Sequence, residues 1–344
     1  MKTSVPLIVD PAAMRRRWSP AEPTEVFDTY WRFAAERQSV FFKKAQGLPP
    51  PWTNDPILQA HKFTNAYRAA DRVSQYLIRH VIYTGSQDRD EIFFRVILFK
   101  TFNRIDTWTL LTDSVGGVSA RQCSFAKYEK ALSHALASGR RIYSAAYMMP
   151  AGRSSFGKER KHANHLKLIE SMMDDGLPER IAKSMSMSEA FELVRSYPMI
   201  GDFLAYQYVT DLNYSTLTDF SEMDFVAPGP GARDGVRKCF HSLGGLNEAE
   251  IIKLVADRQD EEFASRGIAF QRLWERPLQL IDCQNLFCEV DKYARVAHPG
   301  VSGISGRSRI KQKYRPVADP IDFWFPPKWR LNEAVQAWRR TVRP

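Results

Sequence analysis

The chain has 344 residues, 44% of them hydrophobic and 12% aromatic, which is enough for one large packed domain or two ordinary ones and excludes a disordered chain. The formal net charge of +10 favours an anionic partner, with nucleic acid ahead of a membrane surface. No apolar run has the length of a membrane span, and the N-terminal sequence lacks a secretory pattern, so we expect a cytoplasmic protein.

Three long helices are expected in the first third of the chain. Aromatic residues recur three and four apart over 24–46, and the following GLPPPWTNDP ends that helix. Asp55 and Pro56 would then cap a second long amphipathic run that continues to about residue 83. Residues 90–113 predict a third helix, whose apolar FFRVILF segment should be buried.

Shorter helices follow at 123–138 and 159–174, then a helical hairpin at 188–210 and further helices at 247–265. There is no internal repeat and little alternation typical of strands. The pattern predicts a mostly α fold with one domain over 1–295, followed by a basic Gly/Ser/Arg-rich tail over 296–344.

The second helical run carries a polar stripe with the spacing of one helix face. Its members are Lys62, Asn65, Arg68 and Arg72. Asp71 falls at its edge, and the aromatic residues Trp52, Phe63 and Tyr67 occupy neighbouring positions. A solvated surface is the simpler explanation of such a stripe, but the aromatics favour the half-buried wall of a cleft for an anionic substrate.

The hairpin at 188–210 places Tyr197-Pro198 after the helix SEAFELVRS, which we expect Ser188 to cap. Ile200 would pack between the two helices, and Gly201 would allow a tight turn. The next helix would begin near Asp202, with its amides directed at a phosphate. This is the pattern of a DNA-gripping helix-hairpin-helix, and an ordinary helical corner explains it equally well.

The stretch DFSEMDFVAPGPGARDGVRKC combines carboxylates, glycines and cations. Three acids come first, and bases follow the glycines: Asp219, Glu222 and Asp224, then Gly229, Gly231 and Gly235, with Arg233, Arg237 and Lys238. A glycine-rich turn before a helix can hold phosphate oxygens. The nucleotide-binding pattern G-x-x-x-x-G-K-[ST] occurs nowhere in the chain.

The chain contains four cysteines: Cys123, Cys239, Cys283 and Cys288. Their number does not indicate a disulfide framework, and the five-residue spacing of the last two does not match a zinc motif, so reduced, buried thiols are expected. In the same region Asn285, Glu289 and Lys292 recur at helical spacing and could face a cleft.

Several long motifs together resemble the α-glutamyl/putrescinyl-thymine pyrophosphorylase family. They are PWTNDPILQAHKFTNAYRAADRVSQYL, RVILFKTFNRIDTW, IGDFLAYQYVTDLNYS, DFVAPGPGARDGVRKCF and CQNLFCEVDKY. The family is also described as amino acid:DNA transferases and as the helical domain associated with 5-hydroxymethyl-deoxyuridine DNA kinases. The likeness runs from about Phe27 to Lys292.

This resemblance implies a helical fold similar to helix-hairpin-helix DNA glycosylases and a role in phage thymidine hypermodification. An upstream DNA kinase pyrophosphorylates hydroxymethyluracil in DNA. The family then replaces pyrophosphate with an amine, either an amino acid such as glycine or glutamate or the polyamine putrescine. Without a nucleotide-binding loop in the sequence, the displacement step is the expected activity, in the bacterial host cytoplasm.

The implied reaction assigns roles to the candidate residues. The general base that deprotonates the amine is expected among Asp211, Glu222 and Asp224. The pyrophosphate ligands are expected to be Lys62, Arg68, Arg72, Gly229, Gly231, Arg233 and Lys238. The thymine-like base must leave the helical stack, and Trp52, Tyr206 or Tyr214 could stack on it. No cofactor is certain, although Mg²⁺ could bind Asp71 or Glu222.

The remaining candidates would contact substrate or DNA. The substrate contacts are expected from Trp52, Asn65, Asp71, Tyr206, Asn213, Tyr214, Asn285, Glu289 and Lys292. The DNA contacts are expected from Ile200, Gly201, Asp202 and the basic tail. The alternatives are a DNA N-glycosylase acting on a modified pyrimidine, which would share the fold and the hairpin, a DNA-binding module without catalysis, and a membrane-surface protein.

Overall fold

The computed structural model describes residues 18–315 and 322–342, and these form two compact units. Unit 1 takes its described residues from 18–71, 222–315, 322–323 and 331–342, and unit 2 comprises 72–221 and 324–330. Each unit therefore joins segments that are distant in the sequence. The sequence suggested a single domain up to residue 295, and that range is divided between the two units.

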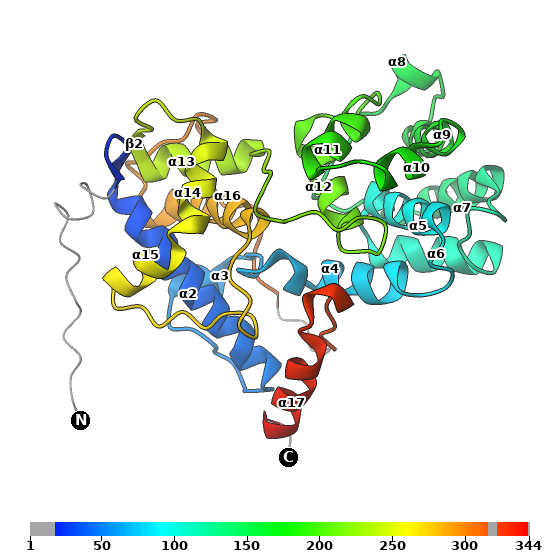
Figure 1. Cartoon of the computed structure of the whole chain (residues 1–344). Coiled ribbons are helices and arrows are strands. Elements are labelled where there is room, and N and C mark those ends of the chain that lie inside the picture. The colour runs from blue at the N-terminus through cyan, green and yellow to red at the C-terminus, as the bar shows by residue number, and fades with distance from the viewer. Residues whose placement is uncertain (1–17, 316–321, 343–344) are drawn as a thin grey trace. The chain divides into compact units, whose positions relative to one another are not determined.

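Unit 1 surrounds the long helix α2 with helices from the second half of the chain (Figure 1). Its helices are α2 (Glu25–Ala45), α3 (Pro56–Ala60), η1 (Arg68–Ala70), α13 (Pro230–Cys239), α14 (Glu248–Asp257), α15 (Gln259–Ser265), α16 (Leu280–Ala297) and α17 (Asn332–Val342). One antiparallel pair, β1 (Glu22–Pro23) with β2 (Phe240–Ser242), completes it. The predicted helix over 24–46 is confirmed: Thr24 caps α2 by accepting a hydrogen bond from the Val26 amide (3.1 Å).

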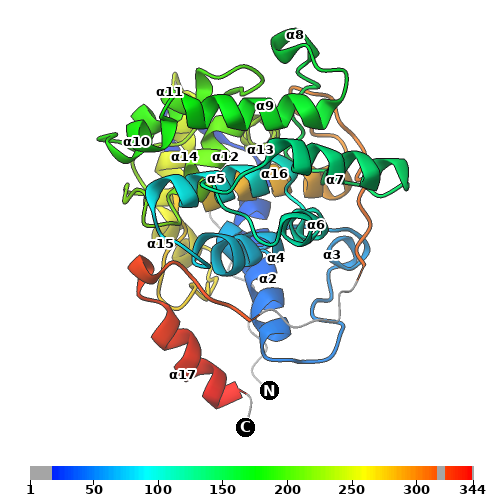
Figure 2. The same cartoon turned by 90° about the vertical axis from the view of Figure 1, so that its right-hand side faces the viewer.

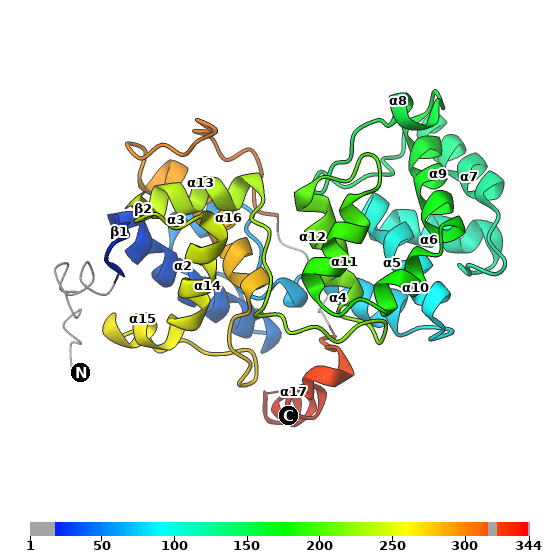
Figure 3. The same cartoon turned by 45° about the horizontal axis from the view of Figure 1, so that its top comes forward.

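Helix α13 packs closely along α16 (Figure 3). A Cβ atom on Gly235 would stand 2.0 Å from the carbonyl oxygen of Phe287, and one on Gly231 would stand 3.2 Å from Cys288 Sγ. The two glycines are four residues apart and so share one helix face. They allow the two helix backbones to approach each other, which accounts for them without a bound phosphate.

Unit 2 is built around α5, which packs against η2, α9, α10 and α12 (Figure 2). Its helices are α4 (Arg72–Tyr76), the π-helix η2 (Leu77–Ile82), α5 (Arg89–Phe102), α6 (Ile105–Val115), α7 (Phe125–Ala137), α8 (Arg153–Phe156), α9 (Lys161–Asp174), α10 (Leu177–Ala182), α11 (Met187–Arg195), α12 (Asp202–Leu212) and η3 (Pro327–Trp329). The apolar FFRVILF segment lies in α5 and is buried, as predicted.

Two of the three long helices expected in the first third are interrupted. The run after Pro56 gives only α3, irregular backbone over 61–67, and then the short helices η1, α4 and η2. The segment 90–113 divides into α5 and α6 at Asn103, whose φ of 48° places it in the left-handed conformation. The shorter helices at 123–138 and 159–174 form as predicted, as α7 and α9.

The hairpin consists of α11 and α12, which pack against each other and are joined by residues 196–201. Ser186 caps α11 rather than Ser188, because its hydroxyl accepts the Glu189 amide hydrogen bond (3.1 Å). Ile200 is buried, whereas Gly201 and Asp202 are exposed at the start of α12. The mostly helical class is confirmed, and the likeness to DNA glycosylases stays a prediction.

Part of the basic tail packs on unit 1. The Ser305 amide and Arg307 Nη2 donate to the buried carboxylate of Asp234 in α13, each over 2.9 Å. Further along, the Tyr314 amide donates to the carbonyl oxygen of Ala60 (3.1 Å). The predicted DNA contacts of the tail at residues 316–321 and 343–344 lie outside the described residues. Within the described part, no helix has the length and apolarity to cross a membrane.

Candidate functional site

The loop over residues 61–71 of unit 1, irregular apart from the short 3₁₀ helix η1, is held largely by carboxylates. The Thr64 amide donates to Glu289 Oε2 (2.9 Å), and the Arg68 amide donates to Asp282 Oδ1 (2.8 Å). Within the loop itself, the Asn65 amide donates to Asp71 Oδ1 (2.9 Å). Hydrogen bonds to charged acceptors are stronger than those to neutral acceptors. These backbone amides therefore donate to carboxylates rather than to the carbonyl groups of the helix that the sequence pattern predicts. Lys62, Asn65, Arg68 and Arg72 therefore do not form a helical stripe.

Arg37 of α2 closes the other side of this loop. Its Nε donates to the carbonyl oxygen of Thr64 (2.9 Å), and its Nη2 donates to Asn65 Oδ1 (3.0 Å). The Asn65 amide group in turn donates to the carbonyl oxygen of Ala70 (3.0 Å). Arg37 is buried, so its donors fix the loop and the position of the Asn65 side chain.

The face of α16 that carries Asn285, Glu289 and Lys292 points toward the same loop. Asn285 Nδ2 donates to Thr64 Oγ1 (2.9 Å), and Lys292 Nζ forms an ion pair with Glu289 Oε2 (2.7 Å). The Lys292 ammonium also lies 4.5 Å from the centre of the Phe63 ring. Five of the residues predicted to bind substrate are thereby gathered in one polar cluster: Asn65, Asp71, Asn285, Glu289 and Lys292.

Two carboxyl groups of this network have raised pKa values. Burial raises the pKa of Asp71 to about 7, partly opposed by the Asn65 amide and by Arg37. Burial likewise raises the pKa of Asp282 to about 7, although the amides of Gln279 and Arg68 favour its charged form. Asp71 is half-buried and Asp282 is buried. Asp71 is therefore the carboxyl that an external molecule can reach, and it can exchange a proton near neutral pH.

The predicted acids of the 219–224 segment have different surroundings. The Glu222 carboxylate pairs with Arg276 Nη2 (2.8 Å), and its negative charge contributes to the raised pKa of Asp282. Glu222 thus lies beside the network. Asp224 is exposed and pairs with no residue that the structure describes.

Two of the predicted pyrophosphate ligands of unit 1, Lys238 and Gly231, have structural roles instead. Lys238 is 1% exposed, and its Nζ forms an ion pair with Asp291 Oδ1 (3.0 Å) inside the unit. Removing it from that partner would leave a buried charge unpaired, so this placement does not support phosphate binding by Lys238. Arg233 and Lys62 are exposed. Gly229 is the residue before the first turn of α13.

The other predicted site residues belong to unit 2, where most are in the core. Tyr206 and Tyr214 are each 1% exposed, so neither can stack on an unpaired base. The Asp211 carboxylate is buried in an ion pair with Lys100 Nζ (3.0 Å). Asn213 uses its side chain to hold the turn that ends at Phe220. Burial corrects the predicted contact roles of these four side chains.

Trp52 and Arg72 also keep accessible side chains. Trp52 in unit 1 is half-buried and lies against the ammonium of Lys44, 4.5 Å from its ring centre. Arg72 in unit 2 is half-buried at the start of α4. Of the aromatic residues proposed to stack on the base, Trp52 alone has the exposure that this role requires.

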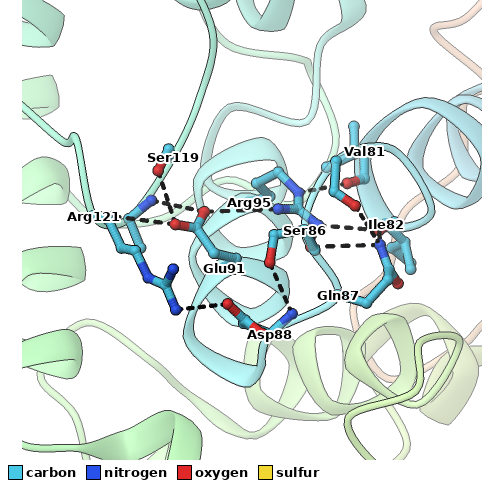
Figure 4. Close-up of polar contacts among 11 residues, drawn as sticks. Val81, Ile82, Ser86, Gln87, Asp88, Glu91, Arg95, Ser119 and Arg121 are labelled. Atoms are coloured by element: carbon cyan, nitrogen blue, oxygen red, sulfur yellow. Dashed lines mark hydrogen bonds and ion pairs between the residues drawn. The ribbon is translucent and has the colours of Figure 1, made fainter.

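Unit 2 contains a cavity of about 510 Å³ between the 84–86 loop and the 117–122 loop. Two buried charges of α5 fix these walls (Figure 4). Glu91 accepts hydrogen bonds from Ser119 Oγ (2.8 Å) and from the amides of Ala120 (2.9 Å) and Arg121 (3.2 Å). One turn further on, Arg95 donates to the carbonyl oxygens that end η2 and to that of Ser86 (2.7 Å). The cavity has the size of a small-molecule site.

Several residues that organise these sites were not predicted from the sequence. They are Arg37, Thr64, Glu91, Arg95, Lys100, Arg276 and Asp282. Nothing local separates them from the solvated charges found on most helices. The one usable signal was the charged pair Glu91 and Arg95, four apart, because the other residues from 92 to 99 are all apolar.

No metal centre is formed by the residues that the structure describes: no three His, Cys, Asp or Glu side chains among them could hold an ion together. All four cysteines are free thiols. Cys239 and Cys283 are buried and Cys123 and Cys288 are half-buried, which agrees with the expectation of reduced thiols.

The chain belongs to the family described as "5-hmdU DNA kinase, helical domain", which matches residues 24–303. It is also similar to the "5-hmdU DNA kinase" of Bacillus phage SP10, with 25% identity over 347 aligned residues. The match covers 94% of this chain and 53% of the phage protein, so the chain spans about half the length of that relative. No solved structure matches it. The predicted relation to these helical domains is confirmed, and the transferase assignment stays a prediction.

Proposed function

We propose that this chain acts in thymidine hypermodification and displaces pyrophosphate from 5-(pyrophosphoryloxymethyl)uracil in DNA with an amine. The relative named as a 5-hmdU DNA kinase supports the pathway. The observation that carries the chemistry is the half-buried Asp71 carboxyl, whose pKa burial raises to about 7. The Asn65 backbone amide donates to it, and the charges of Arg37 and Arg68 act on its pKa.

In this reaction the amine nitrogen attacks the methylene carbon of the modified base. The carbon–oxygen bond to pyrophosphate breaks, and the leaving group takes the bonding electron pair. The proton that nitrogen loses passes to a general base. A carboxylate with a pKa near 7 is a much stronger base than an ordinary one, and about half of it is ionised at neutral pH. We therefore assign this role to Asp71 in preference to Asp211, which is buried in an ion pair.

Cations near the loop would stabilise the charge that develops on pyrophosphate. Lys62 is exposed at the start of the loop, and Lys292 lies over Phe63 on its α16 side. We assign the leaving group to these two side chains. Trp52, half-buried in the same unit, is the candidate to stack on the extruded base.

The test uses DNA carrying pyrophosphoryloxymethyluracil, a mixture of amino acids and putrescine, and mass spectrometry of the released nucleosides. We expect Asp71→Asn to lower the rate of amine incorporation by roughly 10²- to 10⁴-fold while its affinity for DNA stays unchanged. Asp257→Asn is the matched control, because it removes an exposed carboxylate of the same unit that has no predicted role in the reaction. Equal activity of Asp71→Asn and the control would refute Asp71 as the base.

The pH dependence gives an independent check. Because the pKa of Asp71 is raised to about 7, kcat/KM should rise with pH below 7 as the carboxyl loses its proton. Deprotonation of the attacking amine also raises the rate with pH, and comparing glycine with an amine of lower pKa separates that contribution from the one of Asp71. A profile that is flat from about pH 5.5 to 8 with both amines would contradict the assignment.

The second candidate is a DNA N-glycosylase, in which an acid that follows the hairpin would act on the sugar–base bond. The acids that follow the hairpin are Asp211, which is fully buried against Lys100, and the 219–224 cluster, in which Glu222 pairs with Arg276 and Asp224 is exposed. Incubation with modified DNA followed by alkali separates the two, since a glycosylase leaves abasic sites that break and the transferase does not.

A further inference from the structure

A small cavity of about 140 Å³ lies in unit 2 where α6 begins. Its walls come from the first turn of α6 and from the segment that follows α7. Three of the lining residues are arginines: Arg104, Arg140 and Arg141. Asp106 is the one carboxylate among the lining residues, so three positive charges face one negative charge.

Arg104 has an unused hydrogen-bond donor at this cavity. Its Nη2 contacts the Asp106 carboxylate, but its Nε is enclosed and has no hydrogen-bond partner. Enclosed N–H groups without an acceptor are rare in folded proteins because their desolvation is not compensated. A turn of the Arg104 guanidinium toward an acceptor in the cavity would supply the missing bond.

The other two arginines are available to the same ligand. Arg140 and Arg141 are exposed, and neither forms an ion pair within the described part of the chain. Arg104 also occupies the position before the first turn of α6 without capping it. The amides at the start of this 11-residue helix add positive potential on the same side.

We propose that this cavity binds a phosphoryl group, and that the ligand is a backbone phosphodiester of DNA. Guanidinium groups suit phosphoryl oxygens because their donors lie in a planar fork. The cavity volume limits the size of the ligand, since pockets that bind small molecules are usually about 300–1,000 Å³. A single phosphate group fits this cavity and a nucleobase does not. The choice of DNA as its source rests on the proposed function.

The test is the double variant Arg140→Gln/Arg141→Gln in the full chain. Both side chains are exposed, so the fold should be retained. The matched control is Lys127→Gln/Lys130→Gln, which removes the same charge from exposed positions of the preceding helix α7. Affinity for unmodified duplex DNA of random sequence is measured as a function of salt concentration.

We expect the arginine variant to lose roughly 10- to 100-fold in affinity, and its plot of log K against log salt to become shallower by about 1, as for one phosphate contact. The control should keep the wild-type slope. Equal losses in both variants would mean that only overall charge matters, and would overturn the proposal. An unchanged slope in the arginine variant would overturn it as well.

A second arm separates the two sources of phosphate. Inorganic phosphate and pyrophosphate are titrated against the melting temperature of wild type and of the arginine variant. Competition of low-millimolar phosphate with DNA for the wild type supports one shared site. If phosphate raises the melting temperature of the wild type but not of the arginine variant, and both proteins bind DNA with equal affinity, DNA is not the ligand of this cavity. At saturating DNA the arginine variant should retain amine transfer, so a failure here is distinct from a failure of the Asp71 assignment.

Discussion

Each unit contains a carboxyl group, half-buried or buried, that holds a loop by accepting hydrogen bonds from its backbone amides. The two carboxyl groups differ in their pKa. In unit 1 Asp71 accepts the amide of Asn65, and burial raises its pKa to about 7. In unit 2 burial opposes the charged form of Glu91, but donors from residues 119–121 outweigh it and the pKa of Glu91 is lowered. The number of donors that reach a buried carboxylate therefore decides whether it serves as a fixed charge or as a base near neutral pH.

The largest expected effect comes from removing the fixed charge. Glu91→Ala should lower the free energy of unfolding by about 3–5 kcal/mol, because Arg95 loses a buried partner and the 119–121 segment loses its acceptor. Urea unfolding at pH 7 measures this. Asp88→Ala, which removes an exposed partner of Arg121 nearby, is the control and should cost under about 1 kcal/mol. A loss of similar size in both would show that Glu91 is not special.

The pH dependence of stability should have opposite signs in the two units. The folded pKa of Asp282 is raised to about 7, so its contribution is fully present below the unfolded pKa near 4 and is lost as pH rises through 7. Glu91, with a lowered pKa, contributes stability that is lost as pH falls through its folded pKa.

We expect Asp282→Asn to remove a decline in unfolding free energy on the order of 4 kcal/mol between pH 4 and 8. In the wild type, the free energy of unfolding should fall as Glu91 is protonated at acid pH. The variant Glu91→Gln should not show this part of the decline. Unfolding midpoints of the two variants from about pH 2 to 8 provide the comparison, because the Glu91 contribution is lost only below the ordinary pKa of a glutamate. Parallel profiles for both variants would contradict the difference between the two carboxylates.

The smallest effect concerns glycines, which also differ between the units. A Cβ on Gly201 would meet no atom within 4 Å, so Gly201→Val should leave the unfolding midpoint unchanged. If the hairpin grips a phosphate, the variant should lose a fewfold to tenfold in DNA affinity, because the side chain would stand between the backbone amides and the DNA. An unchanged salt-dependent affinity would mean that the hairpin is an ordinary corner.

Gly235→Ala is the counterpart in unit 1. Its new methyl group would meet the carbonyl oxygen of Phe287, so it should destabilise the fold by about 1–3 kcal/mol. Thermal unfolding of both variants tests whether Gly235 is required for helix packing and whether Gly201 is not.

The helices with uninterrupted apolar periodicity could be predicted from the sequence alone. The helices α2, α7 and α9 form where the pattern places them, because periodicity and caps act over a few residues. The shared face of Asn285, Glu289 and Lys292 was predictable for the same reason, since α16 is a continuous helix.

The loop over 61–71 shows what only the tertiary structure decided. Its sequence has helical spacing, but its amides bind Glu289 and Asp282, more than 200 residues away. The burial of Tyr206, Tyr214 and Asp211 likewise depends on which helices surround α12. Short-range preferences can be read along the chain, whereas solvent exposure, pKa and distant hydrogen-bond partners exist only once the chain has folded.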